Sequence, residues 1–156
     1  MPGDITVGVI SDTHGLLRPD ALKKLRGVDA IVHAGDVGDP EILTPLRQIA
    51  PLTAVRGNID TAAWCKVLPE TEVLELGGVN LYVLHNVQEL DLEPSAAGFS
   101  AVIFGHSHKP SIERLKCVLF FNPGSAGPRR FSLPISLGKI TIRKGKVEAE
   151  LMTLKE

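Results

Sequence analysis

Short apolar runs alternate with amphipathic ones through the first half of the chain. In order they are ITVGVIS, ALKKLRG, VDAIVHAGD, EILTPLRQIA and PLTAVRGN. This order predicts a βαβαβ unit, which is a parallel sheet with right-handed crossovers. Asp39 offers a helix cap, Pro40 a first helical position and Glu41 a first-turn acid, so the second helix should begin there.

The second half of the chain changes to runs rich in Val, Leu and Ile that are separated by turns. Gly77-Gly78 and the KGK at 144–146 are typical of short hairpins, so this half should be mainly strand, with one short helix near 93–98. No composition shift marks a linker, so we expect one domain over residues 1–156. The two halves together predict a layered α/β sandwich with two sheets.

The composition limits the class of partner. The chain of 156 residues has a formal net charge of −1 and 44% hydrophobic residues, which predicts one substantial core and no basic surface for long nucleic acid. No apolar run approaches the roughly 18 residues of a membrane helix, and no signal-peptide pattern precedes the first strand. Cys65 and Cys117 fit no paired metal spacing, which favours a reduced, cytoplasmic protein.

Seven residues with metal-binding side chains stand directly after five of the predicted strands. They are Asp12, His14, Asp36, Asn58, His85, His106 and His108. Because the carboxyl ends of parallel strands meet at one edge of a sheet, where α/β folds place ligands, we expect them to share one rim. Imidazole, carboxylate and carboxamide oxygen suit Mn, Fe, Ni, Co or Zn, whereas Ca needs more oxygens. Each short motif alone is unspecific, but the whole set predicts a metal site.

In this order the motifs resemble those of the calcineurin-like metallophosphoesterase superfamily, in particular its small single-domain bacterial and archaeal members. The matching stretches are SDTHG (11–15), HAGD (33–36), RGNID (56–60), the strand-end His85, GHSH (105–108) and NPGSAGPRR (122–130). The resemblance implies a four-layer α-β-β-α sandwich with two mixed β-sheets. It also implies a metal-dependent phosphoesterase, and more narrowly a phosphodiesterase that acts on a small phosphate ester.

Carried over position by position, the resemblance implies two divalent cations. One would be held by Asp12, His14, Asp36 and His108, and the other by Asp36, Asn58, His85 and His106. A hydroxide bridging two such cations, about 3.5 to 4 Å apart, can attack phosphorus in line with the leaving oxygen. The bridging Asp36, with Asn58 and His85, would be the catalytic residues. Manganese is our first expectation for the metal, while Ni, Co, Fe and Zn stay open because availability also decides.

Two positions depart from the family pattern. Many members have a His directly after the Asn, where it acts on the leaving group, but this chain has Ile59 followed by Asp60. The site should therefore work best on substrates with good leaving groups, and it resembles family members associated with phosphodiesters. His85 is followed by Asn86 where the family commonly has Gly, and this amide could bind substrate or face solvent.

Several other residues allow more than one interpretation. His33 could be a satisfied core histidine or a partner that orients a metal ligand. Residues 122–125 fit a turn better than a set of donors to the site. Arg56, Arg129 and Arg130 could grip a phosphate, although solvated surface arginines are the simpler interpretation for at least two of them.

Two functions of different classes are consistent with these residues. The first is the phosphodiesterase, and the alternative is a non-catalytic protein-binding scaffold on the same fold, as in some relatives. Scaffold relatives tend to have lost metal ligands, whereas all seven positions here carry competent ligand types, which favours the enzyme. A nuclease for long DNA ranks last because no basic groove is indicated. The oligomeric state, including a homo-oligomer, stays open.

Overall fold

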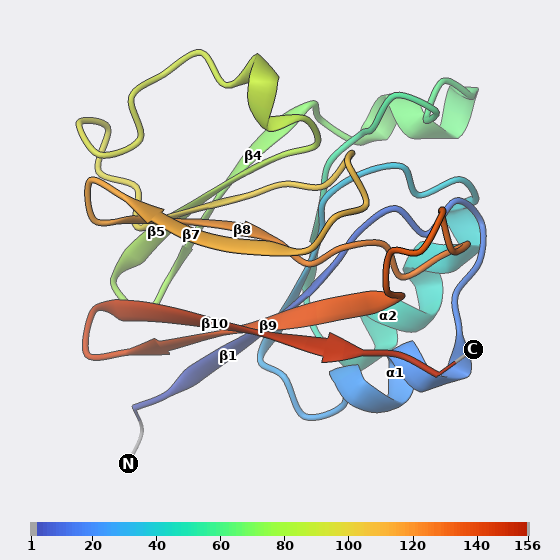
Figure 1. The fold of residues 1–156 in the computed structure, drawn as a ribbon, viewed down its shortest axis with the longest axis horizontal. Coiled ribbons are helices and arrows are strands. Elements are labelled where there is room, and N and C mark those ends of the chain that lie inside the picture. The colour runs from blue at the N-terminus through green and yellow to red at the C-terminus, as the bar shows by residue number, and fades with distance from the viewer. Residues whose placement is uncertain (1–2, 156) are drawn as a thin grey trace.

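Two five-stranded sheets pack face to face in the computed structural model, which describes residues 3–155 (Figure 1). The first sheet contains β1 (Ile5–Ile10), β2 (Ala30–His33), β3 (Leu52–Ala54), β9 (Ser136–Arg143) and β10 (Lys146–Thr153). The second contains β4 (Thr71–Leu76), β5 (Val79–Leu84), β6 (Ala101–Ile103), β7 (Ser111–Leu115) and β8 (Val118–Asn122). Their orders are β10-β9-β1-β2-β3 and β4-β5-β6-β8-β7. Both contain parallel and antiparallel pairs, so the prediction of two mixed sheets is confirmed.

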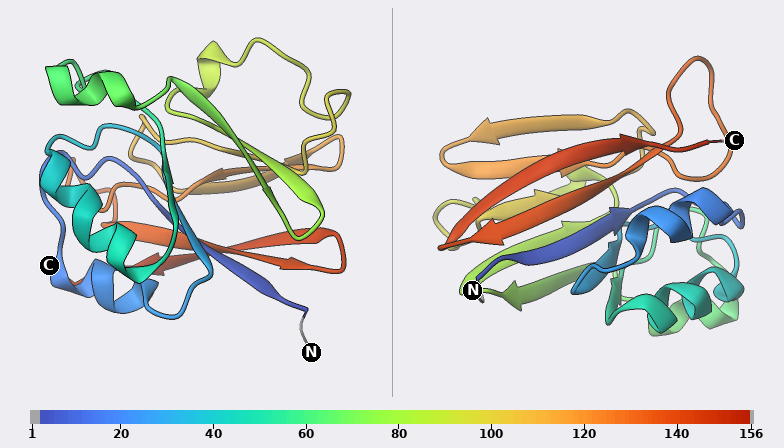
Figure 2. Two further views of the ribbon diagram at one scale, coloured as in Figure 1. Left: turned by 180° about the vertical axis from the view of Figure 1, so that it is seen from behind. Right: turned by 90° about the horizontal axis from the view of Figure 1, so that it is seen from below.

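The helices lie on the face of the first sheet that is turned away from the second sheet (Figure 2). They are α1 (Pro19–Leu25) and α2 (Leu43–Ile49), and the shorter 3-10 turns are η1 (Pro40–Ile42), η2 (Ala63–Val67) and η3 (Val87–Glu89). The predicted βαβαβ unit is confirmed, because β1, β2 and β3 pair in parallel with helices between them. Asp39 caps η1 by accepting the Glu41 N–H at 2.9 Å, and η1 runs directly into α2, so the α-helix begins at Leu43, a few residues later than expected. No helix within residues 3–155 is long and apolar enough to cross a membrane.

The two predicted hairpins are present. Gly77 and Gly78 join β4 to β5 with φ of 59° and 81°, and Lys144 and Gly145 join β9 to β10 with φ of 53° and 77°. Two consecutive left-handed residues are what a type I′ turn requires, and this turn matches the twist of the strands. A third hairpin turns at 116–117, inside the run SIERLKCVLFFN. Neither of these two positions is Gly or Asn, so the sequence does not predict this hairpin.

The outer face of the second sheet is covered by the loop at 86–100 rather than by an α-helix. The helix expected near 93–98 is a single turn, in which Ala97 donates to the Glu93 carbonyl at 3.0 Å. Gly98, at φ 85°, ends this turn. Phe99 from the loop packs its ring 5.0 Å from that of Tyr82, so the loop seals the sheet with apolar side chains.

The main core fills the space between the two sheets. Phe121 of β8 is fully buried there, and its ring lies against Gly138 of β9, where a Cβ would fall 2.2 Å from Cζ. A second core joins the first sheet to α1 and α2. Together the two cores hold the carboxyl ends of β1, β2, β5 and β6 at one edge of the molecule, which is where the candidate site forms.

Phe121→Ala should lower the free energy of unfolding by about 3 to 5 kcal/mol, because it opens a cavity between sheets that cannot close over it. Urea denaturation measures this loss. Phe131→Ala is the matched control, since that ring is 88% exposed, and its effect should stay within about 0.5 kcal/mol. Equal losses in the two variants would contradict the placement of Phe121 at the centre of the core.

Candidate metal centre

Four strand ends from both sheets bring carboxylate and imidazole groups together. Asp12 follows β1 and Asp36 follows β2, while His85 directly follows β5 and His108 lies beyond β6. The groups that converge include five of the seven predicted residues, namely Asp12, His14, Asp36, His85 and His108. The parallel order of these strands, predicted from the sequence, is therefore what assembles the site.

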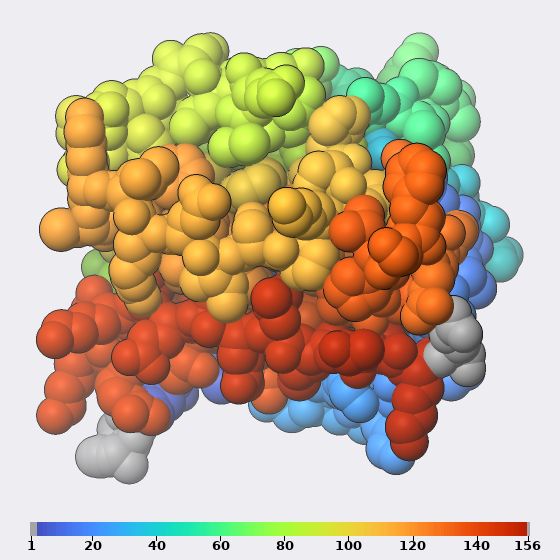
Figure 3. All heavy atoms as spheres, viewed as in Figure 1, coloured from blue at the N-terminus to red at the C-terminus, as the bar shows by residue number. Residues whose placement is uncertain are grey.

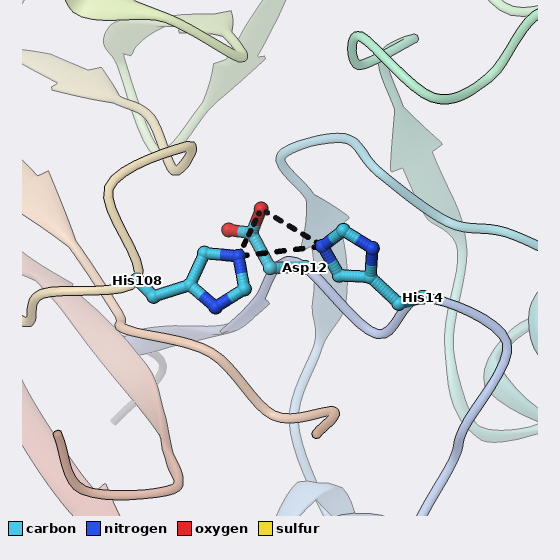
Figure 4. A group of neighbouring side chains, drawn as sticks. All are labelled: Asp12, His14 and His108. Carbon is cyan, nitrogen blue, oxygen red and sulfur yellow. Dashed lines mark hydrogen bonds and ion pairs between the residues drawn. The ribbon is translucent and has the colours of Figure 1, made fainter. Parts of the chain in front are cut away.

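The first ligand group consists of Asp12, His14 and His108, whose side chains point toward one another in Figure 4. The Nε2 atoms of the two histidines are 3.3 Å apart. Asp12 Oδ1 lies 3.5 Å from Nε2 of His108 and 3.8 Å from Nε2 of His14. Three ligand atoms thus lie close enough together to hold one metal ion.

The second ligand group consists of Asp12, Asp36 and His85. His85 Nε2 lies 3.2 Å from Asp36 Oδ2 and 3.8 Å from Asp12 Oδ1. Asp36 Oδ2 is also 3.6 Å from Nε2 of His14, which belongs to the first group. Both carboxylates therefore stand between the two groups.

Asn58 and His106, the other two predicted residues, lie at the exposed rim of the site. His106 belongs to neither ligand group, but its ring meets the His85 ring edge-on at a centroid distance of 5.2 Å. Asn58 borders a cavity together with His85, and the amide of the next residue, Ile59, donates to Asp36 Oδ1 at 3.1 Å. His106 thus lies beside the second ligand group, and Asn58 borders the same cavity as His85.

The site contains buried polar atoms that have no hydrogen-bond partner. Within residues 3–155, Asp12 Oδ1 and His85 Nε2 are buried and accept no hydrogen bond. The His85 Nδ1 donates to the Ala34 carbonyl at 2.8 Å, since a carbonyl can only accept, and this leaves the Nε2 lone pair directed at the carboxylates. A buried carboxylate oxygen without a partner is costly. A divalent cation would satisfy both atoms, so the residues present fit a metal.

The electrostatics of the site favour ionised carboxylates. Burial acts to raise the pKa of Asp36, but His85, the Ile59 amide and His14 outweigh it and the pKa is lowered. Burial acts to lower the pKa of His85, but the Asp36 and Asp12 carboxylates outweigh it and the pKa is raised. Burial lowers the pKa of His108, with Arg130 and His14 adding to it, which favours the neutral imidazole that binds metals.

Backbone strain is concentrated at this site. Among residues 3–155, nine residues other than glycine have a positive φ, and five of them are predicted ligands: Asp12 (56°), His14 (47°), Asp36 (58°), His106 (75°) and His108 (64°). Three more turn the hairpins, and the ninth is Phe131. Each such residue costs of order 1–3 kcal/mol and persists only where its surroundings hold it. Three buried polar side chains hold these strained residues in place.

His33 is the first of them. Thr13 Oγ1 donates to the Val37 carbonyl at 2.9 Å, which uses its only proton, so His33 Nε2 donates to Thr13 Oγ1 at 3.0 Å. His33 Nδ1 accepts from the Gly35 N–H at 3.1 Å. One neutral imidazole therefore ties the loop of Asp12 and His14 to the loop of Asp36. His33 is both a core histidine and a partner of the ligand loops.

Asp60 is the second. Its buried carboxylate accepts three backbone N–H groups, from Val37 and Gly38 at 3.1 Å and from Gly57 at 2.9 Å. It locks the loop after Asp36 to the loop that carries Asn58, and its oxygens are occupied by these donors. This role of Asp60 cannot be predicted from the sequence, because nothing in RGNID shows that a carboxylate turns back onto its own loop.

Asn122 is the third, within the predicted turn at 122–125. Its Nδ2 donates at 3.1 Å to the Gly105 carbonyl and to Ser107 Oγ, while Oδ1 accepts the Gly124 N–H at 2.9 Å. Ser125 Oγ donates to the Asp12 carbonyl at 3.1 Å. The segment is a turn, as expected, and it also braces the histidine-bearing loop after β6.

Two mixed sheets with carboxylates and imidazoles at a shared rim define an α/β sandwich of the metallophosphoesterase type. Residues 5–145 match the calcineurin-like phosphoesterase superfamily domain, and the chain belongs to this family. A probable metallophosphoesterase of Methanocaldococcus jannaschii is 35% identical over 99% of this chain and 84% of its own length. Membership of this family, whose members are metal-dependent phosphoesterases, confirms the resemblance that the motifs indicated.

Two solved structures share the fold. An archaeal phosphodiesterase superposes with a TM-score of 0.80 over 96% of this chain and 100% of its own, at 22% identity. Vacuolar protein sorting 29 of Cryptosporidium parvum superposes with a TM-score of 0.78 over 99% of this chain and 100% of its own, at 19% identity. The fold thus occurs in an enzyme and in a sorting protein, so the fold alone does not decide between catalysis and protein binding.

The buried His33 should make stability depend on pH. Burial lowers its pKa from 6.5 to about 4, so between these values the unfolded chain binds the proton and the folded chain does not. Stability is then fully present above pH 6.5 and falls by up to about 3 kcal/mol as the pH drops toward 4. Urea denaturation of the metal-free protein across this range measures the loss. His33→Gln should give a flatter curve, and an equally steep one would contradict the assignment.

Proposed function

We propose that this protein is a phosphodiesterase that hydrolyses a small phosphate diester with the help of two divalent cations. The observation that carries the proposal is the position of Asp36 Oδ2, 3.2 Å from Nε2 of His85 and 3.6 Å from Nε2 of His14. One carboxylate oxygen is shared between histidines of the two ligand groups, as a dinuclear site needs.

Each cation would have four ligands in this proposal. The first would be held by Asp12, His14, Asp36 and His108, and the second by Asp36, Asn58, His85 and His106. The compact first ligand group supports the first set. Asn58 and His106 would complete the second set by turning inward from the rim, where their exposed side chains are free of the main core. When bound, the two cations supply the attacking hydroxide and neutralise charge on the phosphoryl oxygens.

The residues of this chain would bind and orient the ester. Asp36 holds its charge because its pKa is lowered, and the Ala34 carbonyl fixes the ring of His85. Arg130 lies near enough for its charge to act on His108, so it would face a phosphate held at the site. Manganese remains our first expectation for the metal, with Ni, Co, Fe and Zn as alternatives.

The preference for diesters rests on the residues at the position where many family members carry a proton donor for the leaving group. Ile59 is 46% exposed there and cannot donate a proton, and the carboxylate of Asp60 is occupied by three backbone donors. A leaving oxygen would have to depart without a proton from this loop. Esters with good leaving groups, rather than phosphoproteins, are therefore the substrates that we propose.

A protein-binding scaffold is the second candidate function. Leu16, Ile59 and Phe131 are exposed apolar side chains on loops of the site edge, at 39%, 46% and 88% of their surface. Such residues are common in docking surfaces. The unpartnered buried atoms of Asp12 and His85 favour the enzyme, because a scaffold has no use for them.

The proposed enzyme acts in the cytoplasm on small phosphate esters, with no part for long nucleic acid. Cys65 is buried and Cys117 is exposed in a hairpin, and both are free thiols, as in a reducing compartment. Assembly into a homo-oligomer stays open.

Metal should restore turnover of bis-p-nitrophenyl phosphate to protein that has first been stripped of metal. We expect Mn to restore it best among Mn, Ni, Co, Mg and Zn, and turnover of p-nitrophenyl phosphate to be lower. Release of p-nitrophenol measures both reactions. Asp36→Asn should lose more than roughly a hundred-fold in rate, because it removes the shared charge, while the exposed Glu150→Gln should not change it. Absence of turnover with every metal in a folded protein would favour the scaffold.

Ile59→His should raise turnover of diesters with poor leaving groups, because it supplies a proton donor at the position where many family members have one. A gain of roughly ten-fold or more is expected for an alkyl ester, with little gain for the p-nitrophenyl ester. Ile59→Gln, which has similar bulk but does not titrate, is the control. The same gain in both variants would show that exposure, rather than proton donation, limits the reaction.

A further inference from the structure

Two cavities border the candidate metal centre. One, of about 780 Å³, is bordered by Asn58 and His85, and the other, of about 460 Å³, is bordered by His106. The rings of His85 and His106 meet edge-on at a centroid distance of 5.2 Å, so the two cavities are bordered by neighbouring side chains of the site. A diester has an organic arm on each side of its phosphorus, and both volumes are of the size that ligand sites have.

The two cavities differ in chemistry. The larger one is lined by Glu70, Glu89 and Asp91, and its Arg56 is paired with Glu70 at 3.3 Å. This excess of carboxylates disfavours an anionic or purely apolar arm. The smaller cavity is lined by aromatic, amide and cationic side chains, namely Phe104, Phe131, Asn86, Gln88 and Arg130. It offers what a planar aromatic ring with a polar edge requires.

Phe131 is the unusual residue of the smaller cavity. Its side chain is 88% exposed, whereas the other four phenylalanines are buried or half-buried. Its φ is 55°, and among residues 3–155 it is the one strained position outside the hairpins and the predicted ligands. The orange segment that joins β8 to β9 stands out on the surface in Figure 3. A bulky residue held in this conformation is a mark of function rather than of packing.

The polar groups of the smaller cavity are held in place for recognition. Asn86 Oδ1 accepts the Gln88 N–H at 3.1 Å, which fixes the side chain and leaves its Nδ2 as the donor it can offer. The Arg130 side chain forms no hydrogen bond or ion pair within residues 3–155, and its charge acts on His108. The smaller cavity thus combines Phe131 for stacking, an amide for the ring edge and a cation for the phosphate, beside His106 of the site.

We propose that the cavity between Phe131, Asn86 and His106 binds an aromatic ring of the ester, such as a nucleobase, by stacking on Phe131. This rests on the proposed function, because it assigns one arm of the diester to one side of the same site. The larger, carboxylate-lined cavity then takes a neutral or cationic polar arm. The substrate class is therefore a nucleotide-derived diester without a second anionic group.

Binding of two non-hydrolysed ligands tests this subsite. Adenosine monophosphate and ribose phosphate share a phosphate and a sugar and differ in the base, and calorimetry on the Mn-loaded protein measures both affinities. We expect adenosine monophosphate to bind roughly ten-fold more tightly, which is what one base stacked on an aromatic side chain contributes. Phe131→Ala should lose most of that difference and Phe131→Trp should keep it. Leu115→Ala, an exposed apolar residue on β7, should leave it unchanged.

The possible results separate this inference from the proposed function. Equal binding of the two ligands by the wild-type protein, or a preference that survives in Phe131→Ala, would overturn the subsite even where bis-p-nitrophenyl phosphate is hydrolysed. A preference that depends on Phe131 supports the subsite, and it would do so even if no metal restored turnover, in which case the hydrolase would be wrong and the ligand site would remain. Circular dichroism verifies that each variant is folded.

Discussion

The buried Asp12 carboxylate is the constraint on which the rest of this structure depends. Its side chain is fully buried, one oxygen accepts hydrogen bonds from Ser11 Oγ and the His106 N–H, and the other has no partner. An unpartnered carboxylate oxygen at this depth needs a positive charge beside it. The imidazoles of His14, His85 and His108 all direct Nε2 toward it at 3.5 to 3.8 Å, an arrangement that a cation would complete.

The fold holds this cluster on strained loops, and the strain lowers the stability of the chain. Predicted ligand residues with a left-handed backbone follow strands of both sheets. They stay in place because His33, Asp60 and Asn122 hydrogen-bond the loops to one another. These braces join β1 to β2, β2 to β3, and β6 to β8. The site is therefore a property of the whole sandwich, since each ligand group takes residues from both sheets and loosening either sheet would pull its members apart.

The sequence predicted the sheets and the strand-end residues that converge at the candidate site, but not the way in which those residues are held. Periodicity and strand-end positions were enough for the βαβαβ unit, the hairpins at Gly77 and Gly145, and the rim that carries Asp12 and Asp36. The role of Asp60 could not be predicted, and the two interpretations of His33 could not be decided, because both depend on which backbone N–H groups a turned loop leaves unpaired. Phe131 could not be singled out from the sequence either, because its exposure and its positive φ are properties of the three-dimensional structure.

The proposed chemistry requires two cations that share a carboxylate, and this is the claim to test most directly. We would titrate Mn into metal-free protein, count the bound ions by mass spectrometry and record the electron paramagnetic resonance spectrum. The account predicts two ions per chain with a spin-coupled spectrum, because Asp36 contacts histidines of both ligand groups. One ion per chain, or two ions without coupling, would contradict the shared carboxylate and with it the proposed dinuclear mechanism.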